Sequence, residues 1–172
     1  IYYYTAVSDE ISNAKVRLEI AKVQLEYLFS DVSFLDADPV FSSQLPSTAN
    51  SESRMESHSF MNDFINLSNI ETSYISPALD TAVRTTHVIL SLDAYVTMSE
   101  CRYLQGRYLA SQAFWKECRN VLFTLFMDES EVVVSKGAPP GFLERLLAII
   151  RRLVRLLFCY ESEFINRNLA VI

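Results

Sequence analysis

Residues 7–35, VSDEISNAKVRLEIAKVQLEYLFSDVSFL, decide the fold class of this chain. Their apolar side chains recur at alternating steps of three and four residues, the spacing of a helix seam that packs lengthwise against other helices. Residues 143–164 repeat the pattern near the other end of the sequence. The first ladder comprises Val7, Ile11, Ala14, Leu18, Ala21, Leu25, Leu28, Val32 and Leu35, and the last comprises Leu143, Leu146, Ile150, Leu153, Leu157, Tyr160 and Phe164. We therefore predict an all-α protein.

Few residues in this chain interrupt helices, since only 3 of the 172 are Gly and 5 are Pro. We predict that residues 1–172 form a single domain, an antiparallel up-and-down bundle of four to five long helices. Because the sequence begins at Ile1 rather than Met, we expect this domain to be excised from a longer protein. The expected helices cover residues 8–35, 58–72, 77–103, 104–127 and 139–166, and the expected mobile loops cover residues 36–57 and 128–138.

Three local signals set the expected helix boundaries. Residues 8–10, Ser-Asp-Glu, place a capping hydroxyl and two carboxylates where a helix dipole favours them. Ser76-Pro77 is a cap followed by a Pro at the first helical position, which predicts a helix start. Gly106 is expected to break or kink the chain between the third and fourth helices.

The first helix carries a second apolar stripe beside its main ladder. This stripe consists of Val16, Ile20, Val23 and Tyr27. A helix with two apolar stripes contacts neighbours on two sides. We interpret the second stripe either as a docking face for a partner or as a contact with other helices of the same bundle.

The bulk properties argue against several classes of function. A net charge of −6 disfavours binding to the phosphate backbone of nucleic acids. The most apolar stretch, residues 142–160, is interrupted by Glu and Arg and predicts no membrane span. Cys101, Cys118 and Cys159 form no close pair and no zinc pattern, so we predict reduced, buried thiols of a cytosolic protein.

The sequence nominates no catalytic group, metal or cofactor. No Glu-x-x-His pair occurs, which argues against a di-iron carboxylate site in the bundle. His58 is predicted at a surface or cap position, and His87 as a hydrogen-bonded core residue with no nucleophile nominated beside it. Asp93 falls on the apolar side of the third helix, and we interpret it as an exposed gap in a broad stripe. We predict that the protein is not an enzyme.

Arg151, Arg152 and Arg155 form the one basic cluster and are the candidate contact residues for a partner. They fan across one side of the last helix, where they are suited to an acidic partner or to anionic lipid headgroups. The alternative is a solvated face closed by Glu residues of neighbouring helices.

Three stretches carry a resemblance to a known family. They are Val-Arg-Leu-Glu-Ile-Ala at 16–21 continuing to Glu26-Tyr27, Ile-Ser-Pro-Ala-Leu at 75–79, and Pro-Pro-Gly-Phe-Leu-Glu-Arg-Leu at 139–146 continuing to Phe-Cys-Tyr-Glu at 158–161. In sequence and in order they resemble the helical region of the small scaffold subunit of the KICSTOR complex. In that family a similar Leu-Ser-Pro opens the long third helix, and a Pro-Pro opens the last.

The resemblance implies a non-enzymatic scaffold within a multi-protein complex. KICSTOR sits on the lysosomal surface and recruits the GATOR complex, which acts on Rag GTPases in the negative regulation of target-of-rapamycin signalling by nutrients. It therefore implies protein partners, a cytoplasmic location at the lysosomal membrane, and no nucleic acid or small-molecule substrate. Two alternatives remain open: a regulatory bundle that binds an apolar ligand between its helices, and a peripheral membrane module.

Overall fold

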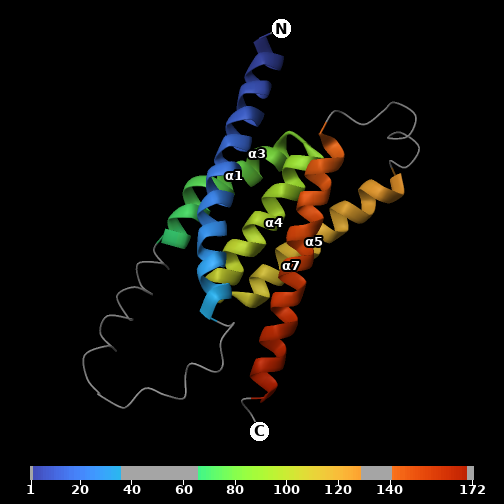
Figure 1. Ribbon diagram of the computed structural model, residues 1–172. Helices are drawn as coiled ribbons and strands as arrows, with labels where there is room; N and C mark the ends of the chain where they lie inside the picture. The colour runs from blue at the N-terminus through green and yellow to red at the C-terminus, as the bar shows by residue number, and fades with distance from the viewer. Residues whose placement is uncertain (1, 36–65, 129–140, 170–172) are drawn as a thin grey trace.

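The computed structural model describes residues 2–35, 66–128 and 141–169, and within these residues it contains helices and no strand (Figure 1). The elements are α1 (Tyr2–Leu35), the π-helical turn η2 (Glu71–Ile75), α3 (Ser76–Arg84), α4 (Val88–Leu104), α5 (Tyr108–Asp128) and α7 (Phe142–Leu169). The prediction of an all-α bundle is confirmed, whereas the up-and-down order of the helices stays a prediction. The expected loops 36–57 and 128–138 lie outside the described residues, except that Asp128 is the last residue of α5.

Helix α4 is the centre of the molecule. It packs against α1 and α3 on one side and against α5 and α7 on the other, and α5 crosses behind it obliquely in Figure 1. Between Leu90 and Cys101 only Asp93 and Tyr95 are more than slightly exposed. A helix that is buried around most of its circumference needs neighbours on every side, and α4 has them.

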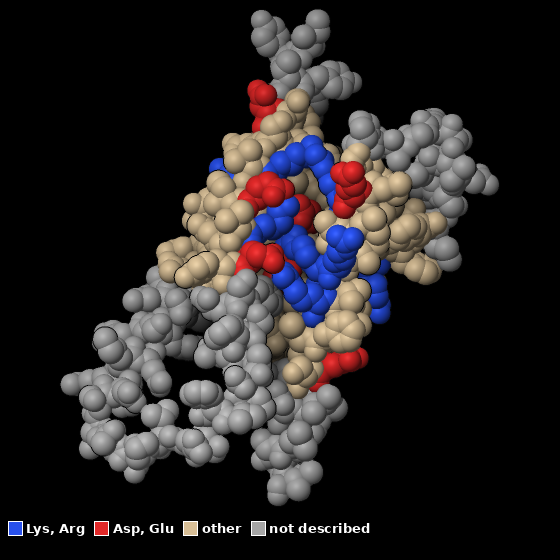
Figure 2. Space-filling view, viewed as in Figure 1, with Lys and Arg blue, Asp and Glu red and all other residues tan. Residues whose placement is uncertain are grey.

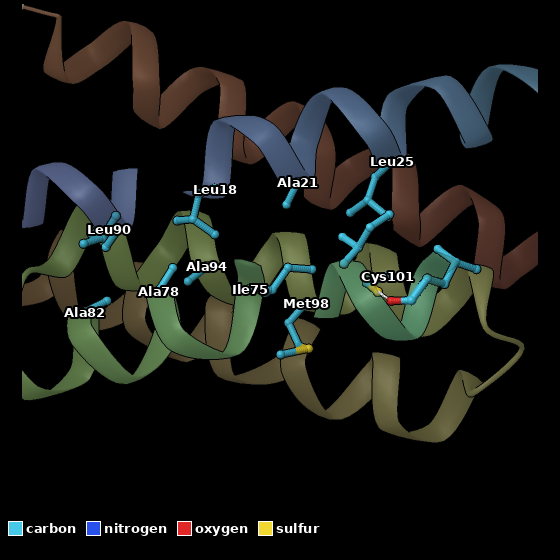
Figure 3. Close-up of a cluster of buried hydrophobic side chains, with 13 residues drawn as sticks. Leu18, Ala21, Leu25, Ile75, Ala78, Ala82, Leu90, Ala94, Met98 and Cys101 are labelled. Atoms are coloured by element: carbon cyan, nitrogen blue, oxygen red, sulfur yellow. Dashed lines mark hydrogen bonds between the residues drawn. The ribbon is translucent and has the colours of Figure 1, made fainter. Parts of the chain in front are cut away.

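Two apolar clusters fill the spaces on either side of α4. The first joins α1, the segment 66–75, α3 and α4, and many of its members are small, such as Ala21, Ala78 and Ala94 (Figure 3). Small side chains at a helix crossing let the backbones approach closely. The second joins α4, α5 and α7, with Leu92 and Leu156 fully buried.

The buried face of α7 differs from the predicted ladder. Leu146 and Leu153 are buried as expected, but Leu143 and Leu157 are 62% and 41% exposed. The observed seam is Leu146, Ile149, Leu153 and Leu156. Apolar residues surround so much of α7 that spacing alone allows more than one seam, and packing on α4 and α5 selects among them.

The predicted third helix is two helices, because the chain turns at Thr86. The N–H of Thr86 donates to the Val83 carbonyl at 3.2 Å, and the N–H of His87 donates to the Ala82 carbonyl at 3.1 Å. These bonds form a Schellman motif that ends α3. Its left-handed position is normally Gly, but here it is Thr86, with φ of 51°, so the sequence carries no Gly signal for this break.

Helix α3 begins at Ser76, at the predicted Ser76-Pro77 boundary, but no side chain caps it and the chain is already helical before it. Residues 66–70 are helical and continue through η2 into α3, and Ser76 does not follow a side-chain cap. The N–H of Ser76 bonds the Glu71 carbonyl five residues back, and this wider turn accommodates the Pro ring, which would clash in a regular helix. Pro77 lacks an N–H, and the guanidinium of Arg17 donates to the Ser73 carbonyl instead, at 3.4 Å.

Two further helix boundaries can be compared with those predicted from local sequence signals. Helix α1 begins at Tyr2 and passes through Ser8, so the predicted cap at residues 8–10 is wrong. Gly106, with φ of 71°, ends α4 in a second Schellman motif, which confirms the predicted break. No helix in the described part of the chain combines the length and the apolar character needed to cross a bilayer.

Candidate functional site

An open groove of about 520 Å³ lies between α1 and α7, with α4 as its floor. Figure 2 shows this face, where Lys and Arg side chains surround a hollow that has carboxylates at its base. Both α1 and α7 pack on α4, and a groove stays open between them. The lining residues are Lys15, Val16, Glu19, Ile20, Lys22, His87, Ile89, Leu90, Asp93, Arg145, Ala148, Ile149 and Arg152.

Arg152 of α7 reaches the floor of the groove and is held by three side chains of α4. Its Nε lies 3.1 Å from both carboxylate oxygens of Glu100, and its Nη2 donates to the same carboxylate. Its Nη1 lies 2.7 Å from Asp93 Oδ1, and Nη2 also donates to Thr97 Oγ1 at 2.8 Å. The spacing of Asp93, Thr97 and Glu100 places them on one face of α4, so a single guanidinium bonds all three.

Two further cations connect this cluster to α1. Arg155 donates to Glu100 Oε1 at 2.7 Å and to Glu26 Oε1 at 3.2 Å. Lys22 Nζ lies 3.0 Å from Asp93 Oδ2 and 2.5 Å from Glu19 Oε1. We call Lys22, Asp93, Thr97, Glu100, Arg152 and Arg155 the ionic cluster. It ties α1 and α7 to α4 through opposite charges.

Charge pairing outweighs burial in this cluster. Burial by itself lowers the pKa of Arg152, but the Glu100 and Asp93 carboxylates more than offset this, and the pKa is raised. The pKa of Arg155 is raised for the same reason, by Glu100 and Glu26 against the effect of burial. Both guanidinium groups therefore stay charged at any pH at which the protein is folded.

The three candidate Arg residues do not form one exposed patch. Arg151 is exposed, whereas the side chains of Arg152 and Arg155 are 15% and 34% exposed and are paired with Glu100. The interpretation of Asp93 as an exposed gap is wrong, because its side chain is 20% exposed and bonds both Lys22 and Arg152. Glu100, which sequence reasoning missed, is the most buried carboxylate of the group, at 2% exposed.

His87 caps the N-terminus of α4 at one end of the groove. Its Nδ1 accepts a hydrogen bond from the Leu90 N–H at 3.2 Å, so the neutral ring carries its proton on Nε2. Burial lowers the pKa of His87, and Lys15 and Arg145 lower it further. The predicted hydrogen bond is present, but the residue is a half-buried helix cap rather than a core residue.

A second polar cluster, which we call the hydroxyl cluster, joins α4, α5 and α7 through Ser99, Ser111 and Tyr160. Ser99 Oγ donates to the Ser111 carbonyl at 2.8 Å, and Ser111 Oγ donates to the Ser99 carbonyl at 2.5 Å. These reciprocal bonds use both serine protons, so Tyr160 is the donor toward Ser111 Oγ, at 2.5 Å. No base among the described residues bonds this cluster, so it offers no activated nucleophile.

The thiols are poor nucleophiles as well. Cys101 and Cys118 are buried, and Cys159 is half-buried, which confirms burial for two of the three. Burial raises the pKa of Cys101 to about 12, with Glu71 and Glu100 adding to the shift. Burial also raises the pKa of Cys118 to about 12, although Arg152 opposes it in part. Among the described residues no group of three His, Cys, Asp or Glu could hold a metal ion.

The second stripe of α1 lies on the outer surface of the bundle. Val16, Ile20, Val23 and Tyr27 are 58%, 39%, 71% and 70% exposed. They follow one another at steps of four, three and four residues, on the side of α1 away from the core ladder. The described residues do not show the second interpretation of this stripe, in which it contacts another helix of the bundle.

The comparisons with known proteins supply no relative for this molecule. The chain was set against protein-family models, curated protein sequences and solved structures, and none of the three comparisons finds a match.

Proposed function

We propose that this domain is a non-enzymatic scaffold that binds other proteins through the outer stripe of α1. The observation that carries the proposal is the exposure of Val16, Ile20, Val23 and Tyr27 in one continuous row. Scattered apolar residues are normal on protein surfaces, but a contiguous row marks an interaction site. Steps of four, three and four residues are those of a coiled-coil seam, so the occupant that fits is an apolar helix face of a partner.

The opposite face of α1 fixes the stripe in its outward orientation. Leu18, Ala21 and Leu25 are at most 1% exposed in the core, and Lys22 and Glu26 are ion-paired at the edge. Turning the stripe inward would expose the core ladder and break these pairs. A partner therefore meets a pre-organised surface and loses little affinity to rearrangement.

The partners that we propose are those implied by the resemblance to the KICSTOR scaffold subunit. Part of the stripe falls in the two segments that carry the resemblance, 16–21 and Glu26-Tyr27. On this proposal the protein assembles with the other KICSTOR subunits and helps to place GATOR at the lysosomal surface. The domain would then act in amino-acid-dependent negative regulation of target-of-rapamycin signalling.

The test is an affinity pull-down of the tagged protein from cells, read by mass spectrometry. We expect the wild type to recover KICSTOR subunits and GATOR, and the double variant Val23→Ser/Tyr27→Ser to recover them at least tenfold less. The matched control is Leu109→Ser/Phe123→Ser, which removes apolar side chains that are 85% and 63% exposed on α5. This control should recover the partners as the wild type does.

Two results would contradict the proposal in different ways. Absence of every KICSTOR and GATOR subunit from the wild-type pull-down would refute the partner assignment. An equal loss of partner recovery by both double variants would refute the role of the α1 stripe. Thermal melting of each variant separates lost binding from lost folding, since surface substitutions change stability by only about 0.5 kcal/mol.

The two alternatives receive less support from the geometry. The membrane module rests on joint exposure of Arg151, Arg152 and Arg155, but two of these are engaged by Glu100. The apolar-ligand bundle calls for a closed apolar cavity, but the groove between α1 and α7 is open and has a charged floor.

A further inference from the structure

The groove between α1 and α7 carries positive charge on a protein that is negative as a whole. Its lining contains the four cations Lys15, Lys22, Arg145 and Arg152 against the two carboxylates Glu19 and Asp93, and with Glu100, which bonds Arg152, the local balance is +1. The whole chain has a net charge of −6. A recess that carries charge of one sign between low-dielectric walls concentrates ligands of the opposite charge.

The four cations fall into two pairs with different surroundings. Lys22 and Arg152 lie in the ionic cluster, where Asp93 bonds both of them. Lys15 of α1 and Arg145 of α7 belong to opposite walls, and neither side chain makes a hydrogen bond or ion pair with another described residue. Both act on the imidazole of His87, which places them at the same end of the groove. Within the described part of the chain, the charge of these two side chains is therefore left for a ligand.

The remaining walls are apolar. Val16 and Ile20 line the groove from α1, Ile89 from α4, and Ala148 and Ile149 from α7. A volume of about 520 Å³ lies within the usual range for small-molecule sites, roughly 300–1,000 Å³, and such sites combine apolar walls with a few convergent polar groups.

We propose that this groove binds an amphiphilic anion, a molecule with one carboxylate or phosphate head and an apolar body. The head lies between Lys15 and Arg145, and the Nε2–H of His87 is a further donor at that end. The body lies along the apolar walls toward Ile20 and Ile149. Such a ligand cross-links α1 and α7, which both pack on α4, and it therefore stabilises the fold in proportion to its occupancy.

The site shares Val16 and Ile20 with the outer stripe of α1, but Lys15 and Arg145, which hold the head of the ligand, lie outside the stripe, and the site does not depend on the scaffold proposal. We commit to a monomeric ligand rather than a membrane surface because the apolar walls lie inside a recess between two helices. A flat bilayer would reach the rim of that recess, but its headgroups would leave the walls unfilled.

The experiment is isothermal titration calorimetry of the whole chain with dodecanoate and dodecyl phosphate, both below their micellar concentrations. Inorganic phosphate serves as the head alone, and dodecanol as the apolar body alone. We expect the two amphiphiles to bind at least tenfold more tightly than either part, and to raise the melting temperature. Lys15→Ala and Arg145→Ala should each weaken binding about tenfold, since each removes a charge-assisted contact.

Matched controls are Lys116→Ala on α5 and Arg151→Ala on α7, which remove exposed cations outside the groove lining. These variants should bind as the wild type does. The proposal is overturned if dodecanol binds as tightly as dodecanoate, or if phosphate alone matches the amphiphiles. It is also overturned if the control variants lose affinity equally, or if only anionic phosphatidylserine vesicles bind and the monomers do not.

Discussion

Two polar clusters join α4 to α7, one mainly through ion pairs and the other through hydrogen bonds between hydroxyl groups. The ionic cluster places Arg152 between Asp93 and Glu100 and extends to α1 through Lys22 and Arg155. The hydroxyl cluster places Tyr160 against two serines that bond each other's carbonyl groups across α4 and α5. Apart from the Thr97 hydroxyl, the first cluster consists of acidic and basic side chains, whereas the second consists of hydroxyl groups.

The difference explains why the groove lies where it does. Small serine side chains let α4 and α5 approach closely, and these two helices make the most extensive contact in the described part of the molecule. Long Lys and Arg side chains instead span the distance from α1 and α7 to α4, and the space between those helices stays open. A buried ion pair gives little net stability but is costly to break on one side only. We therefore expect the two clusters to respond differently to substitution.

The largest expected effect is that of Glu100→Gln. This change leaves Arg152 and Arg155 without the buried carboxylate that they share, and it should lower the free energy of unfolding by about 3–5 kcal/mol. Urea unfolding followed by circular dichroism measures it. A loss below about 1 kcal/mol would mean that the cluster behaves as a surface salt bridge, and the contrast between the two clusters would fail.

The second expected effect is a loss of stability at alkaline pH, centred on Cys118 beside the ionic cluster. Burial raises the pKa of its thiol from 9.0 to about 12. Between these values the unfolded chain loses the proton while the folded chain keeps it, so the stability present below pH 9 falls as pH rises. Each such thiol contributes a slope of about 1.4 kcal/mol per pH unit.

The measurement is the free energy of unfolding from pH 8 to pH 11. Cys101 titrates in the same sense, and Tyr160 does so above its ordinary pKa, which burial raises. Cys118→Ala should therefore reduce the slope of the unfolding free energy against pH by the contribution of one thiol. The slope that remains is due to Cys101 and Tyr160. An unchanged slope would show that Cys118 ionises in the folded protein.

The third prediction concerns the hydroxyl cluster. Tyr160→Phe removes one donor but leaves the reciprocal serine bonds intact, so it should lower the free energy of unfolding by about 1 kcal/mol. The change should add to that of Glu100→Gln within about 0.5 kcal/mol if the clusters are independent. Urea unfolding of both single variants and of the double variant tests this. If Tyr160→Phe lowered the free energy of unfolding as much as Glu100→Gln does, the hydroxyl cluster and the ionic cluster would not differ in their response to substitution.

The smallest effect is expected at the exposed edge of the ionic cluster. Glu26 pairs with Arg155, but its side chain is 66% exposed, so Glu26→Gln should change the free energy of unfolding by less than about 1 kcal/mol. Raising the salt concentration should reduce the difference further. Together with Glu100→Gln, this variant compares two carboxylates that bond the same Arg155 side chain and differ in burial.

Much of the local structure was predictable from short-range patterns. In the first ladder, Ala14, Leu18, Ala21 and Leu25 are buried as the spacing predicts, and Gly106 ends α4 because a left-handed residue there suits Gly. The break at Thr86 was not predictable, because a β-branched residue rarely takes a positive φ. The Ser76-Pro77 signal marked the start of α3 but not a separate helix, since the wide turn of η2 accommodates the Pro within a continuing helix.

The residues of the candidate site were likewise only partly predictable from the sequence. The cluster Arg151, Arg152 and Arg155 is visible in the sequence, but the role of each Arg is not. Arg152 and Glu100 are 52 residues apart, and Arg155 and Glu26 are 129 apart. Pairing over such separations leaves no periodic signal, so Asp93 and Glu100 could not be assigned partners in advance. Ser99 and Ser111 carried no signal either, because their bonds exist only where α4 crosses α5.

By itself, then, the sequence determined that the chain is helical, where α4 ends, which face of α1 enters the core, and that α1 carries a second apolar stripe. These features depend on the helical repeat and on single-residue preferences, which act within a few residues. The tertiary structure alone decided which seam of α7 is buried, which Arg residues are neutralised, and that a cationic groove opens between α1 and α7. Those outcomes depend on the distances between helices, because a charge is satisfied or left available only by what the fold brings beside it.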